Sequence, residues 1–87
     1  IRYSSNHIVD YIEIDDQHAI FEAEVPESWI GKSIGELDIR RKFGINILGV
    51  KRGGKTDVFV TAETVLSNDL TILALGKYKQ LQKCFRI

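Results

Sequence analysis

The chain has 87 residues, of which 44% are hydrophobic, and its 12 lysine and arginine side chains balance 12 acidic ones. This length predicts a single domain, and a net charge of zero argues against broad nucleic-acid binding, which needs a basic surface. Cys84 is the only cysteine, which excludes an internal disulfide and fits a reducing cytoplasm; no run approaches the roughly 18 apolar residues of a membrane span. Because the sequence starts at Ile1 and contains no methionine, we expect it to be part of a larger protein.

The first part of the chain predicts a β-hairpin. Residues 1–6 are polar and are expected to form a connector, followed by one domain over residues 7–87. Apolar and polar residues alternate over 8–14 and again over 19–25, which is typical of strands, and the polar residues between them are turn formers. Pro26 should end the second strand because it has no N–H to donate to a sheet.

A capped helix is predicted from Ser33 to Gly44. Ser33 and Glu36 fit the capping box, in which each side chain accepts a hydrogen bond from the other residue's backbone. Gly44 sits where a helix end favours a left-handed residue, and three basic residues in the last turn suit the helix dipole.

This predicted helix has two apolar faces. Ile34 and Leu37 lie on one side, whereas Ile39 and Phe43 fall nearly opposite. A helix of a small domain usually buries one stripe, so Ile39 and Phe43 are predicted to meet another subunit or a ligand. The alternative is that Phe43 covers the end of the same core.

The second half of the chain predicts a further hairpin and a final strand and helix. A strand over 45–51, a turn at Gly53-Gly54 and a returning strand over 57–61 are followed by a polar connection anchored by Val65 and Leu66. The nearly continuous apolar run over 70–75 predicts a strand buried on both faces, and residues 77–85 predict a short helix. The order β-β-α-β-β-β-α indicates an α+β fold with a small mixed or antiparallel sheet.

No arrangement of residues supports catalysis or a metal site. Asp15 and Asp16 are better explained as a solvated turn, and nothing at zinc-site spacing completes a set with His7, His18 or Cys84. The cap explains Ser33 better than a nucleophilic role does, because no histidine–carboxylate pair is placed to activate it. We therefore do not expect an enzyme or a bound metal.

One set of residues has the chemistry of a nucleotide site. Asp38, Ile39, Arg40 and Asn46 combine an apolar surface with a fixed cation and an amide. Arginine pairs with phosphates and stacks on flat rings, and asparagine can both donate to and accept from a base edge. The alternative is that Arg40 is an ordinary surface side chain and Asn46 a strand-edge residue. On chemistry alone, the residues favour this alternative.

Short motifs carry a family resemblance that spans almost the whole chain. They are Val9–Glu13, Asp15–Ile20, Gly31–Ile34, Leu37–Arg40, Lys42–Ile47, Lys51–Gly53 and Asp69–Gly76. In their order and spacing the chain resembles the C-terminal regulatory domain of RCK potassium-channel proteins, the TrkA-C domain, and especially its Ktr branch.

The resemblance implies a cytosolic regulatory domain of a potassium-uptake system, held at the cell membrane by a transporter subunit that the full-length protein binds. In that family the domain dimerises, and in the Ktr branch it binds cyclic di-AMP between two subunits. The implied partners are therefore a second copy, a small nucleotide and a membrane transporter, with no cofactor. A purely structural dimerisation module without its own ligand is the alternative function, and an enzyme is a distant third.

The resemblance also implies which residues form the ligand cleft and where this chain departs from the family. The cleft residues correspond to Ile34, Asp38, Ile39, Arg40 and Asn46. Arg41 stands where the family usually has alanine, so its side chain would narrow the cleft or add a phosphate contact. The family's usual proline near residues 60–62 is missing, which removes a rigid wall against which a base could pack.

Overall fold

The computed structural model describes residues 7–86, so the predicted connector over 1–6 lies outside the described residues. The strands and helices follow the predicted order, except that the first helix is divided in two. The elements are β1 (Ile8–Glu13), β2 (His18–Glu24), η1 (Glu27–Trp29), α1 (Ile34–Leu37), α2 (Ile39–Phe43), β3 (Asn46–Arg52), β4 (Lys55–Asp57), β5 (Thr71–Lys77) and α3 (Tyr78–Phe85).

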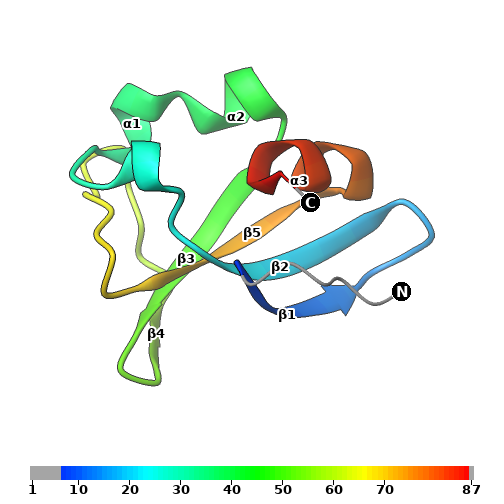
Figure 1. Ribbon diagram of the computed structural model, residues 1–87, viewed down its shortest axis with the longest axis horizontal. Coiled ribbons are helices and arrows are strands. Elements are labelled where there is room, and N and C mark those ends of the chain that lie inside the picture. Colours follow the sequence, from blue (N-terminus) through cyan, green and yellow to red (C-terminus); the bar gives the residue numbers. More distant parts are fainter. Residues whose placement is uncertain (1–6, 87) are drawn as a thin grey trace.

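The strands form one sheet in the order β1-β2-β5-β3-β4, and every described pair is antiparallel. The α+β class is therefore confirmed, and of the two predicted sheet types the antiparallel one is present. β5 is central although it is the last strand in the chain, and it lies between β2 and β3 (Figure 1). β1 and β4 are the two edges of the sheet.

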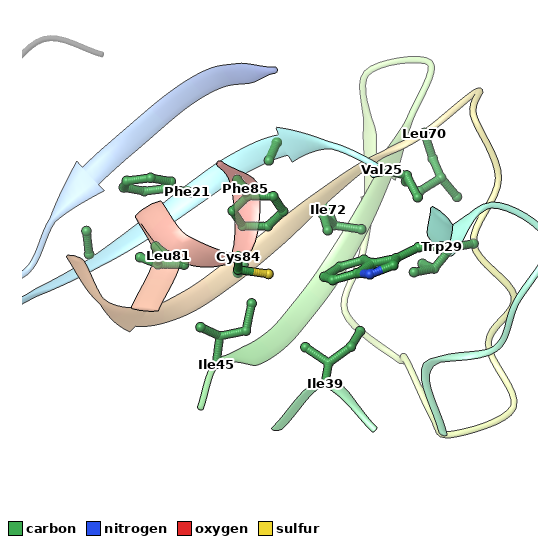
Figure 2. Close-up of a cluster of buried hydrophobic side chains, with 14 residues drawn as sticks. Phe21, Val25, Trp29, Ile39, Ile45, Leu70, Ile72, Leu81, Cys84 and Phe85 are labelled. Carbon is green, nitrogen blue, oxygen red and sulfur yellow. The ribbon is translucent and has the colours of Figure 1, made fainter. Parts of the chain in front are cut away.

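The hydrophobic core lies between one face of the sheet and the helices (Figure 2). Phe21 of β2 and Ile72 of β5 are fully buried there, together with Leu81 of α3. Trp29 packs against Phe85, with ring centroids 6.0 Å apart. Trp29 is therefore part of the core, and the alternation along the strands buries one face of the sheet.

The opposite face of the sheet is only half covered. Burial along β5 alternates, with Ile72, Ala74 and Gly76 buried and the residues between them only partly covered. The prediction that this strand is buried on both faces is therefore wrong, because the described helices pack against one face only. Strand pairing places Ile12, Ile20 and Leu75 in one row across the open face.

The chain between β4 and β5 differs from the prediction. β4 ends at Asp57, so the strand expected over 57–61 is wrong beyond that residue. The Asp57 carboxylate accepts a hydrogen bond from the Phe59 N–H at 2.9 Å, which turns the backbone away from β3. Leu66 is fully buried as predicted, but Val65 is 56% exposed and does not anchor the core.

Candidate functional site

The site begins with the capping box that starts α1. Ser33 Oγ accepts from the Glu36 N–H at 3.2 Å, and Glu36 Oε1 accepts from the Ser33 N–H at 2.8 Å, which confirms the prediction. The N–H groups of Ile34 and Gly35 donate to carbonyls of the 61–66 segment at 2.9 and 2.8 Å. Because these two amides are already satisfied, the start of α1 does not offer them to an anionic ligand.

Asp38 divides the predicted single helix into two short ones. Its φ of 52° and ψ of 44° are left-handed, a conformation that aspartate tolerates better than most residues. The Asp38 N–H donates to the carbonyls of Ile34 and Gly35, the first two residues of α1, and its own carbonyl accepts from the Lys42 N–H at 2.9 Å in α2. The expected continuous helix is therefore wrong, and the break changes the direction in which α2 points its side chains.

This change of direction sends Ile39 into the core. Ile39 is 2% exposed, and Phe43 is half-buried with its ring centroid 5.8 Å from that of Trp29. A subunit contact was predicted because Ile39 and Phe43 were expected to be exposed apolar residues. This reason is wrong for Ile39, which the chain's own core buries. The alternative that Phe43 covers the end of the same core fits its contact with Trp29. Ile34 and Leu37, on the other predicted face, are the pair left partly exposed.

The polar residues of the predicted ligand set form two pairs. Arg40 Nε donates to Asn46 Oδ1 at 2.8 Å, which joins the first turn of α2 to the first residue of β3. Arg41 makes an ion pair with the Asp38 carboxylate. Within residues 7–86 no carboxylate pairs with Arg40, so its positive charge is held in place by a neutral partner.

An exposed apolar patch lies on the loop that follows β4. It consists of Val58, Phe59 and Val65, which are 61%, 88% and 56% exposed, and we call it the loop patch. Val65 forms an isolated β-bridge with Ser33, so this loop runs along the start of α1. The patch was not predicted from the sequence, because the local pattern indicates a strand at Val58 and Phe59 and a core position for Val65.

Apart from the buried Ile39, the predicted ligand residues lie on an open surface of the single chain. A groove of about 820 Å³ is floored by Trp29, Phe43 and Phe85, and a smaller polar one of about 260 Å³ lies beside Glu22 and Lys51. Phe43, which was predicted to meet another subunit or a ligand, lines the larger groove, but none of the predicted cleft residues lines either groove. If Arg40 and Asn46 contact a ligand, the side of that ligand facing away from them must be covered by another protein surface.

The other reactive side chains are dispersed. In residues 7–86 no three histidine, cysteine, aspartate or glutamate side chains lie close enough to hold a metal ion. Asp15 accepts from the backbone of Gln17 and from the side chain of His18, which lowers the pKa of its carboxyl, and it closes the hairpin turn. Burial raises the pKa of the Cys84 thiol to about 12, so the thiol stays protonated and unreactive at neutral pH.

None of the helices formed by residues 7–86 has the length and apolarity needed to cross a membrane.

Comparison with known proteins finds one family and several related structures. The model of the TrkA-C domain matches residues 20–87. Ktr system potassium uptake protein C of Bacillus subtilis (strain 168) is 30% identical over 79 residues, which cover 91% of this chain and 36% of that protein. The chain thus spans about a third of the length of this relative.

Two solved structures have the same fold. The RCK C domain of the potassium transport protein KtrA, in complex with cyclic diadenosine monophosphate, has a TM-score of 0.73 and 31% identity, covering 82% of this chain and 84% of that one. The RCK domain of GsuK has a TM-score of 0.78 and 28% identity, covering 92% of this chain and 18% of that one.

Proposed function

The chain belongs to the TrkA-C domain family, and on this premise we propose that it is a regulatory domain of a potassium transport system that binds cyclic di-AMP between two copies of itself. The protein that carries it would act in the cytosol, against a transporter subunit in the membrane. Support comes from the KtrA C domain, which resembles this chain over most of both lengths and whose structure holds that nucleotide.

The observation that carries the proposal is the Arg40–Asn46 pair. The hydrogen bond from Arg40 Nε to Asn46 at 2.8 Å orients the guanidinium and leaves its two terminal nitrogens for a phosphate. Arg41 next to it is a poorer candidate, because the Asp38 carboxylate already neutralises its charge. Arg41 stands where the family usually has alanine, and a phosphate contact was one of the two roles expected for it. Such a contact would require breaking the ion pair with Asp38.

A second copy of the chain explains why the ligand residues lie on an open surface. Cyclic di-AMP has two phosphates, and a two-fold dimer presents two copies of Arg40, so one guanidinium can meet each phosphate. The loop patch borders the start of α1 through the Ser33–Val65 bridge, and with the half-exposed Ile34 and Leu37 it supplies apolar area that a partner can cover. The proposed dimer contact therefore centres on the loop patch and α1, while Ile39 supports it from the core.

The test is calorimetric titration of cyclic di-AMP into the parent chain and three arginine variants. A charge-assisted hydrogen bond contributes on the order of 1.5–3 kcal/mol, and two copies act on one ligand, so Arg40→Ala should weaken binding by roughly a hundredfold or more. Arg40→Lys should recover part of the affinity, because lysine lacks the planar fork. Arg41→Ala is the matched control and should change the affinity by less than about tenfold, since an exposed ion pair contributes about 0–1 kcal/mol.

Circular dichroism of each variant checks the fold, and sedimentation with and without nucleotide checks the dimer. Unchanged binding by Arg40→Ala would show that Arg40 is not the phosphate clamp. Absence of binding by the folded parent chain, with a dimer that persists, would favour the alternative of a structural dimerisation module.

A further inference from the structure

The two edges of the sheet carry opposite charge. From His7 to Gly31 the chain contains no lysine or arginine and more than half of its 12 acidic residues, namely Asp10, Glu13, Asp15, Asp16, Glu22, Glu24 and Glu27. Most of these lie on β1, β2 and the turn between them, at one side of the sheet (Figure 1). The opposite side, at β3 and β4, carries Lys51, Arg52 and Lys55. Lys51 pairs with Glu22 and Arg52 with Asp69, so the division that remains is an excess of acidic residues at β1 and the turn that follows it.

The acidic side ends in an open strand edge. β1 pairs only with β2 among the described strands, so its outer edge faces away from the sheet. The Ile14 N–H donates inward to His18 at 2.9 Å. Since backbone groups alternate along a strand, those of Glu13 point outward, where another strand can pair with them.

Exposed apolar side chains accompany this edge. Ile12 is 62% exposed and Ile14 52% exposed, and Val9, at an irregularity in the β1–β2 pairing, is 57% exposed. Ile12 also begins the apolar row that crosses the open face through Ile20 and Leu75. A strand added next to β1 would extend this row by one residue, so it needs an apolar side chain opposite Ile12.

We propose that the outer edge of β1 binds a basic, extended segment of a partner protein by strand addition, with lysine or arginine meeting Asp10 and Glu13 and an apolar residue covering Ile12. Strand addition to an exposed edge is an established mode of peptide recognition. A second copy of the chain fits poorly at this position, because pairing β1 with β1 would bring two sets of carboxylates together.

The partner is the membrane transport protein itself, and identifying the partner in this way rests on the proposed function. Cytosolic loops of membrane proteins are rich in lysine and arginine, so such a loop has the charge that this edge requires. Binding there would leave the Arg40 surface free, since α2 and the start of β3 lie away from β1, with β2 and β5 between them.

The test uses fluorescence anisotropy with a labelled peptide of about eight residues, the length of an ordinary strand. Paired antiparallel to β1, it carries a valine opposite Ile12, a lysine one residue earlier opposite Glu13, and a lysine two residues later opposite Asp10. The parent chain should bind it, and the charge-reversed variant Asp10→Lys/Glu13→Lys should bind at least tenfold more weakly. Glu63→Lys is the matched control, because Glu63 is exposed and lies in the loop between β4 and β5, far along the chain from β1; it should leave binding unchanged. Amide shifts in nuclear magnetic resonance spectra should concentrate on residues 8–14.

A second peptide separates strand addition from simple charge attraction. Methylating alternate backbone nitrogens of the same peptide keeps its charge and removes the donors that strand pairing needs, so it should lose binding. Equal binding of the methylated peptide, an equal effect of Glu63→Lys, or no binding to the folded parent chain would each overturn the proposal. Calorimetry with cyclic di-AMP on the same samples distinguishes the two proposals. If the chain binds the nucleotide but not the peptide, only the proposed strand addition at β1 is refuted.

Discussion

Replacing Leu66 with alanine should destabilise the domain far more than replacing its neighbour Val65. Leu66 is fully buried, whereas Val65 is 56% exposed, although both were predicted from the sequence to anchor the core. The comparison tests whether the loop between β4 and β5 is held to the core by this one side chain.

The size of the effect follows from how little the loop can adjust. The Leu66 N–H donates to the Lys32 carbonyl at 2.9 Å, and its carbonyl accepts from the Gly31 N–H at 2.8 Å. These bonds hold the backbone in place, so the cavity left by Leu66→Ala should stay largely open. We expect a loss of about 3 kcal/mol, within the usual range of about 2–5 kcal/mol for leucine to alanine in a core. A domain of this size has a stability of roughly 4–13 kcal/mol, so this loss is a large share of it.

Urea unfolding followed by the fluorescence of Trp29, which is 5% exposed, measures the effect. With an m-value of about 1–1.5 kcal/mol/M, the midpoint for Leu66→Ala should fall by about 2–3 M at unchanged m. Val65→Ala should shift the free energy of unfolding by no more than about 0.5 kcal/mol, at a concentration where the chain is monomeric. A loss below about 1 kcal/mol for Leu66→Ala, or similar losses for both variants, would refute this account of the loop.

Two further predictions concern buried positions. Gly76→Ala should destabilise by about 1–3 kcal/mol, because the added Cβ would lie 2.8 Å from Ile45 Cγ2; the idea fails if Gly76→Ala unfolds at the parent's urea midpoint. Burial raises the pKa of Cys84 to about 12 from an ordinary 9.0, so the unfolded thiol ionises first. Stability should therefore be unaffected below about pH 9 and decline between pH 9 and 12. This decline should be weaker in Cys84→Val, and equal pH profiles for parent and variant would contradict it.

Local patterns determined much of the fold before any tertiary contact was known. The capping box at Ser33 and Glu36 and the left-handed Gly44 both appear as predicted, because each depends on a few neighbouring residues and their backbone. The same holds for the alternation that buries Phe21 and for the final helix, whose apolar residues recur at helical spacing. The motifs spread along the chain were likewise enough to indicate the TrkA-C family, which the comparison confirms.

Tertiary structure decided the features on which the proposed site depends. Asp38 adopts a left-handed conformation that nothing in the local pattern required, and the resulting break directs Ile39 inward instead of toward a partner. Arg40 and Asn46 meet because α2 turns directly into β3, so the orientation of the guanidinium depends on the packing of both elements. Val65 and Leu66 have similar side chains, and only the course of the loop against α1 determined that Leu66 enters the core while Val65 faces outward. Periodicity reports which residues share a face of one element, but the direction of that face is set by contacts between elements far apart in the chain.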